Sequence, residues 1–165
     1  MDLYAEKERL KPRLHCSFDP NDPLCVIAPT GTVAAKMFAV KVTADGVGKV
    51  SSCSARLTAL TQPDGHVVHI EAPIPFAPGE LDGLAPKDII CGDKRYVALI
   101  HIKTMGNEIG IMTVGPRSVD MKDNFSEYGR YLIGFRLVSP EAAAVERAVI
   151  FNWTGDWKTS AMASQ

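Results

Sequence analysis

The chain has 165 residues, enough for one domain with a buried core. Apolar residues make up 46% of the chain and charged residues 22%, as in ordinary globular proteins. Its 18 basic and 19 acidic residues leave a net charge of -1. Without a basic surplus there is no counterion release to drive binding to nucleic acid, so we expect no nucleic-acid partner. No apolar run approaches the roughly 18 to 20 residues that span a bilayer, so we expect no direct membrane insertion of this chain.

Residues 1–12 are predicted to be a charged leader or linker. Residues 5–11 are polar and could form a turn or two of helix, which Pro12 would end. The first ten residues lack the apolar core of a secretory signal. We therefore expect a cytoplasmic location, with the soluble part of a membrane-anchored parent as the alternative.

The first half of the chain contains four segments in which apolar and polar residues alternate, which is the pattern of half-buried strands. In the third segment, for example, Cys53, Ala55 and Leu57 fall on one face. The turn of Gln62, Pro63, Asp64 and Gly65 separates the third segment from the fourth. The predicted strands are residues 13–18, 36–44, 50–61 and 66–71.

A long proline-rich crossover between sheets is predicted over residues 72–92. Pro73, Pro75, Pro78 and Pro86 remove backbone donors, so little regular ladder is expected there. Residues 95–103 follow with apolar side chains on both faces, which favours a central strand. The apolar run 109–114 is interpreted as a further strand.

The segment 127–139 organises the fold. Tyr131, Ile133, Phe135 and Leu137 make one apolar stripe, and a second strand is predicted over residues 143–153. The Gly-x-Tyr entry at Gly129 is similar to the last hairpin of an immunoglobulin-like sandwich. We predict an all-β, immunoglobulin-like two-sheet Greek-key sandwich with seven or eight strands and long proline-rich crossover loops. The domain is expected to span residues 13–157, followed by a flexible tail over 158–165.

The segment 151–157, which reads Phe-Asn-Trp-Thr-Gly-Asp-Trp, contains both tryptophans of the chain. Here the sequence resembles uncharacterised bacterial immunoglobulin-like β-sandwich proteins that end with a similar Trp-x-Gly-Asp-Trp. Residues 18–26 and 53–57 show the same resemblance. The resemblance implies the fold, but it implies no activity. Members of that group often have membrane helices before the sandwich.

Four cysteines formally allow two disulfides, and Cys16 and Cys25 are the pair that best fits such a bond. No export signal is present, so reduced cysteines are the preferred interpretation. Cys53 lies in a strand pattern among small and apolar residues, which suits a buried thiol.

The sequence predicts no metal site, no cofactor and no catalytic residues. His66 and His69 are three apart on a predicted strand, so they point to opposite faces. The oxygen-rich loop at Asp19 and Asp22 contains two prolines and lacks a downstream bidentate Glu for calcium. His101 is interpreted as a core histidine, with a cleft-lining role as the alternative.

We expect a non-catalytic protein-interaction module that binds another protein. The candidate binding residues are Trp157, Asp156 and Tyr128, while Trp153 is predicted to close the core. A small-ligand or carbohydrate-binding sandwich is the alternative, with Trp157, Tyr96 or Tyr128 as the stacking platform. An enzyme whose site is assembled from loops is the third hypothesis. Weak homo-oligomerisation through the edge strands 13–18 and 143–153 is a further hypothesis, with Pro12, Glu146 and Arg147 as partial protection against edge pairing.

Overall fold

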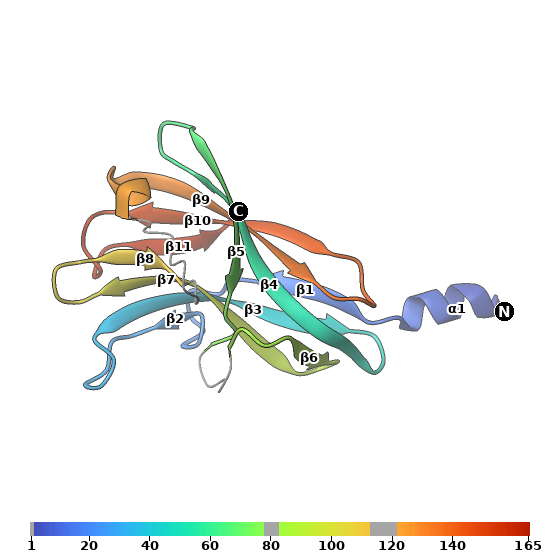
Figure 1. Cartoon of the computed structure of the whole chain (residues 1–165). Coiled ribbons are helices and arrows are strands. Elements are labelled where there is room, and N and C mark those ends of the chain that lie inside the picture. The colour runs from blue at the N-terminus through green and yellow to red at the C-terminus, as the bar shows by residue number, and fades with distance from the viewer. Residues whose placement is uncertain (1, 78–82, 113–121) are drawn as a thin grey trace.

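The computed structural model describes residues 2–77, 83–112 and 122–165, and it is mostly β (Figure 1). Two antiparallel sheets pack against each other, which confirms the all-β sandwich. The first sheet runs in the order β1-β3-β7-β8, and β2 also pairs with β3. Its strands are β1 (Arg13–Ser17), β2 (Val26–Ile27), β3 (Ala35–Asp45), β7 (Lys94–Lys103) and β8 (Ile109–Ile111).

The second sheet runs in the order β11-β10-β9-β4-β5, and β6 pairs with the first part of β4. Its strands are β4 (Lys49–Thr61), β5 (Val67–Ile74), β6 (Lys87–Ile90), β9 (Gly129–Val138), β10 (Val145–Trp153) and β11 (Ala161–Ser164). The described residues thus contain eleven strands, more than the seven or eight predicted. The additional strands, such as β2, β6 and β11, are short or show only weak alternation of apolar and polar residues.

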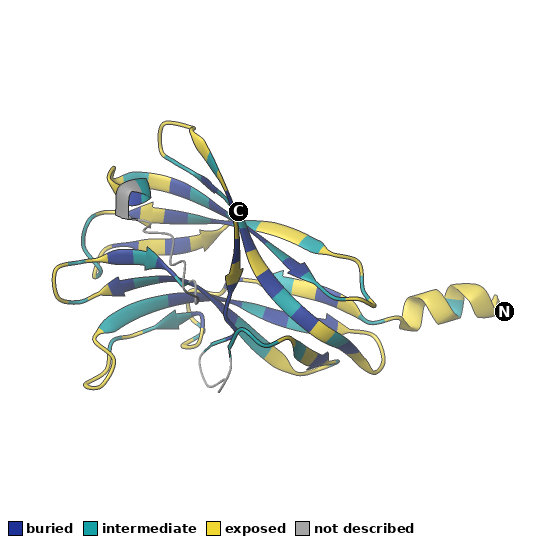
Figure 2. Cartoon of the chain, viewed as in Figure 1, coloured by how far each residue is buried: buried dark blue, intermediate teal, exposed yellow. Residues whose placement is uncertain are grey.

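The core lies between the two sheets, where the inward face of each strand is buried (Figure 2). The predicted stripe of Tyr131, Ile133, Phe135 and Leu137 is confirmed, because all four side chains are almost completely buried. β7 is central, between β3 and β8, as its apolar residues on both faces predicted. Trp153 is buried and its indole Nε1 donates to the Phe125 carbonyl at 3.1 Å, so it closes the core as expected.

The crossover 72–92 contains more ladder than predicted. Pro73 pairs with Arg56 inside β5, which is an edge strand of its sheet and therefore tolerates a missing donor. Beyond it the chain pairs with β7 of the other sheet, since Ala98 N donates to the Pro75 carbonyl at 3.0 Å. Pro78 lies outside the described residues. The crossover therefore joins the two sheets by backbone hydrogen bonds at this corner.

The prediction of a flexible tail over residues 158–165 is wrong, because β11 lies within it. Residues 161–164 pair with residues 149–152 of β10, and Met162 is buried against the core. β10 is therefore covered by β9 on one side and by β11 along half of the other, so it is not the free edge that we expected. β1 does lie at the edge of the first sheet.

The leader forms one helix, α1 (Leu3–Leu10), which extends away from the sheets (Figure 1). Asp2 caps it by accepting from Tyr4 N at 3.0 Å, and no residue of the helix is buried. This confirms a polar helix that ends before Pro12. In the described part of the chain no helix is both long enough and apolar enough to cross a membrane.

Candidate functional site

The loop between β10 and β11, residues 154–160, closes one end of the sandwich, and we call it the cap loop. Its turn is held internally, because the Ser160 hydroxyl accepts from Thr154 N at 3.1 Å and Ser160 N donates to the Asp156 carbonyl at 3.0 Å. Ser160 is only 1% exposed. Gly155 has a φ of +83°, which a glycine adopts without strain.

Side chains of the first sheet fix the cap loop. Lys36 Nζ in β3 donates to the carbonyls of Trp157 and Ser160, both at 3.2 Å. Burial lowers the pKa of this lysine, partly offset by the carboxylate of Asp156. Trp157 N donates to Asn107 Oδ1 at 3.0 Å, in the turn between β7 and β8. A loop that belongs to the second sheet is thus bonded to two places in the first.

Two of the three predicted binding residues have structural roles in this loop. The indole of Trp157 is half-buried and packs against the core, with the ammonium of Lys158 at 5.8 Å from its ring centroid. The carboxylate of Asp156 accepts from Lys158 N at 2.9 Å and so stabilises the turn. Neither side chain projects freely into solvent.

Tyr128, the third predicted residue, is 71% exposed. Its ring lies edge-on to Trp153, with 6.4 Å between the centroids. The ring also covers Gly155, where a Cβ would lie 2.7 Å from it. Tyr128 is therefore brought to the cap loop, where its ring contacts Trp153 and Gly155 while most of its surface faces solvent.

Other exposed apolar side chains lie at the same end, where the β7–β8 turn, the cap loop and the 3-10 helix η1 (Lys122–Phe125) come together (Figure 1). Met105, in that turn, is 84% exposed. The turn is bonded to the β2–β3 loop, since Thr104 N donates to the Ala34 carbonyl at 2.9 Å. The neighbouring Val33 is also exposed. Only the turn residues that follow Met105, Gly106 and Asn107, could have pointed to this position from the sequence.

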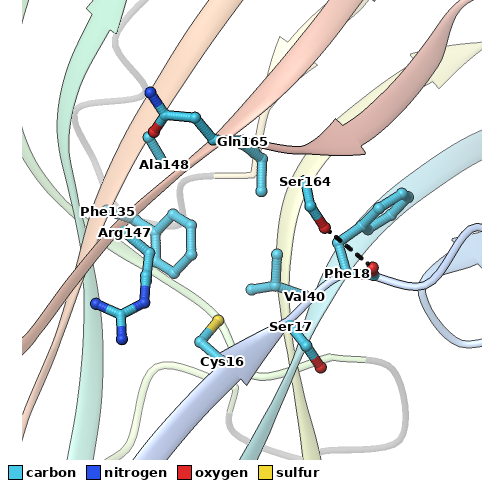
Figure 3. A pocket seen from close by; sticks show the side chains of 10 residues that line it. Cys16, Ser17, Phe18, Val40, Phe135, Arg147, Ala148, Ser164 and Gln165 are labelled. Atoms are coloured by element: carbon cyan, nitrogen blue, oxygen red, sulfur yellow. Dashed lines mark hydrogen bonds between the residues drawn. The ribbon is translucent and has the colours of Figure 1, made fainter.

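A cavity of about 200 Å³ opens between the sheets near the start of β10, away from the cap loop, and we call it the edge cavity (Figure 3). Its walls come from β1, β3, β9, β10 and β11. Its lining is mostly apolar or small: Cys16, Ser17, Phe18, Val40, Phe135, Arg147, Ala148, Val149, Ser164 and Gln165. Ser164 Oγ donates to the Phe18 carbonyl at 3.3 Å and closes one end of the opening.

Arg147 is the one lining residue with a charged side chain. It stands opposite Phe135 in the β9–β10 ladder and so occupies an inward position, in line with Val149 and Phe151. From the sequence, Arg147 was expected only to protect the edge. Its register with Val149 and Phe151 places a charged residue at the border of the sandwich, where its side chain is exposed.

Cys16 faces the same cavity from β1. Burial raises the pKa of its thiol to about 12, although the nearby Arg147 guanidinium opposes the shift. Burial therefore disfavours the thiolate, which is the reactive form of a cysteine. All four cysteines are free, so the prediction of reduced thiols is confirmed.

The histidines do not form a site. His66 and His69 are both exposed, and no group of three or more metal-ligating side chains lies together within the described residues. His101 lies on β7 with its ring against Gly110, and its Nδ1 is buried without a hydrogen-bond partner. Burial lowers the pKa of His101, so its ring is held neutral.

Comparison of the chain with protein-family models, with curated proteins and with solved structures finds no match in any of the three.

Proposed function

We propose that the chain is a non-catalytic protein-interaction module that binds another protein through the end of the sandwich formed by Tyr128, Met105 and the cap loop. The exposed ring of Tyr128, held against Trp153 and Gly155, carries the proposal. Aromatic side chains and Met are enriched at the centres of protein interfaces. A ring that is already held in place loses little conformational entropy when a partner covers it.

The bonds that fix the cap loop support the same proposal. Lys36 and Asn107 hold its backbone from the first sheet, so the loop surface does not need to order on binding. Trp157 and Asp156 then contribute by shaping the loop and not as free contact side chains. Binding loops positioned by a rigid sandwich are a common arrangement.

The immunoglobulin-like type of the sandwich is also part of the proposal. The Tyr131 hydroxyl donates to the Glu127 carbonyl at 2.6 Å near the start of β9, as in the tyrosine corner of that fold. Such sandwiches host many functions, so the fold is compatible with a binding module without requiring one. We further propose a reducing compartment such as the cytosol, because all four thiols are free.

Carbohydrate binding is the second candidate, and the exposed face of Tyr128 favours it because sugar rings stack on aromatic side chains. The other two expected platforms, Trp157 and Tyr96, are partly buried against the core. A single exposed ring offers a small stacking surface, which is why protein binding is preferred.

A photo-crosslinking amino acid placed at position 128 tests the proposal in the cells that produce the protein. We expect a crosslink to one defined protein from position 128, and none from position 130, which is exposed on the adjacent strand. Tyr128→Ala should weaken binding of the purified crosslinked protein by about tenfold or more, as for a central interface residue. Equal crosslinking from both positions would contradict the proposal. Binding to a glycan array that Tyr128→Ala abolishes would establish the second candidate instead.

A further inference from the structure

The ladder between β10 and β11 stops halfway along β10. β11 pairs with residues 149–152 and ends there. Among the described residues no strand pairs with residues 145–148 on that side, and we call this segment the free half of β10. In an antiparallel strand every second residue directs its N–H and C=O to the same side, so a further strand could continue the ladder along the free half in line with β11.

The edge cavity opens beside this free half. It lies between Arg147 and Ala148 on one side and Ser164 of β11 on the other (Figure 3). A second hollow, of about 190 Å³, continues along the same border between the segments 12–14 and 142–145. A strand added in line with β11 would therefore run over the mouth of the edge cavity.

The size and lining of the edge cavity limit what can enter it. Pockets for drug-sized ligands usually measure about 300 to 1,000 Å³, so a cavity of about 200 Å³ fits one side chain better than a free ligand. Its wall is apolar at Phe18, Val40 and Phe135, which suits the stem of a side chain. The guanidinium of Arg147 suits an acidic end.

Arg147 is available for such a group. Within the described chain its guanidinium donates to the Glu146 carbonyl at 2.8 Å and is paired with no carboxylate. An inward-pointing charge at a sheet edge discourages the addition of apolar strands. The same charge favours a strand with a carboxylate at the matching position, so it provides selection as well as protection.

We propose that the free half of β10 binds an extended segment of a partner protein, which adds a strand in line with β11 and places an acidic side chain in the edge cavity beside Arg147. Main-chain hydrogen bonds to residues 145–148 supply affinity, and the cavity supplies selectivity, as in other complexes formed by strand addition. This site lies on a different surface from Tyr128 and does not depend on the function proposed for that surface.

Three capped heptapeptides of alternating Thr and Val, with Glu, Gln or Lys at the centre, test the proposal by nuclear magnetic resonance titration. We expect the Glu peptide to shift the backbone amides of residues 145–148 and to leave those around Tyr128 unchanged. It should bind about fivefold more tightly than the Lys peptide, the ratio for a partly exposed ion pair. Arg147→Glu should reverse that order, and Arg147→Gln should remove the difference.

Arg56→Gln is the matched control, since Arg56 lies on β4, which β9 separates from β10. It should bind the three peptides like the parent chain, as should Tyr128→Ala. The amide spectrum of each variant shows whether it is folded, and Arg147→Gln replaces Arg147→Glu if the latter unfolds. Equal binding of the Glu and Lys peptides, or no shift at residues 145–148 at millimolar peptide, would overturn the proposal. So would concentration-dependent dimerisation that protects residues 145–148 without peptide, because a second copy would then be the occupant.

Discussion

Trp153 and Trp157 are four residues apart but differ in their surroundings. Trp153 is buried, is stacked with Phe151 and donates to the Phe125 carbonyl. Trp153→Ala should lower the free energy of unfolding by about 3–5 kcal/mol, as expected for a large aromatic residue removed from a core. Trp157→Ala should cost less than half as much, because its indole is half-buried. Chemical denaturation of both variants measures the difference. A Trp157→Ala variant as stable as the parent would show that the packing of Trp157 contributes nothing.

The thiol of Cys53 should make the stability of the protein depend on pH. Burial raises the pKa of its thiol to about 11, so the folded state favours the neutral thiol. The resulting stabilisation is complete below the ordinary thiol pKa of 9.0 and is lost as the pH rises towards 11. The stability difference between the parent and Cys53→Ala should therefore shrink over this interval, by at most about 1.4 kcal/mol per pH unit. Denaturant unfolding at several pH values measures it, and a constant difference would contradict the shifted pKa.

Thiol titration provides a second check at the same residue. The denatured, non-reduced protein should release close to four thiols, and in the native state Cys53 should react slowest because it is buried. A result of two thiols or fewer would contradict the reduced state.

β11 is anchored to the core by Met162, its one buried residue. Met162→Asp would place a carboxylate in the core and should detach β11 from β10. Hydrogen exchange of the β10 amides should then accelerate, and the uncovered strand should promote association at high concentration. Ala163→Asp is the matched control, since Ala163 is exposed on the same strand and should leave exchange unchanged. Unchanged exchange in Met162→Asp would show that β11 is not held by its buried face.

Most of the long strands could be predicted from the sequence because their apolar and polar side chains alternate. The stripe of Tyr131 to Leu137 and that of Phe38, Val40 and Val42 are examples, and both are buried. β11 could not be predicted in this way, because four residues with a single large apolar side chain show no period. Its pairing depends on β10, which is a tertiary interaction.

The candidate site was predictable only in part. The turn signal at Gly155 and the aromatic residues around it pointed to the end of the sandwich where the interface is proposed. The exposure of Tyr128 and the burial of Trp157 could not be read from the sequence, since they follow from contacts with Gly155, Lys36 and Asn107. The edge cavity likewise requires β1 and β10 to meet, although they are far apart in the chain.

For the whole molecule, the order of the strands predicts slow folding. β4 pairs with β9, so that Ser54 lies opposite Val138. β7 pairs with β3, although three other strands lie between them in the sequence. Such non-local pairing places folding in the range of about milliseconds to seconds. Stopped-flow circular dichroism should record a β-type signal that appears on this timescale. Microsecond folding, or a spectrum dominated by helix, would contradict the described topology.

The contact between Tyr128 and Trp153 also has an optical consequence. Trp153 is enclosed by apolar side chains, so its fluorescence should be blue-shifted, whereas Trp157 is partly in contact with solvent. Because the ring of Tyr128 lies against Trp153, a ligand that covers or displaces this ring changes the surroundings of the emitting indole. The chain therefore contains an intrinsic reporter at the proposed interface. Emission from Trp153 in a Trp157→Phe background could be used to screen candidate partners without attaching a label.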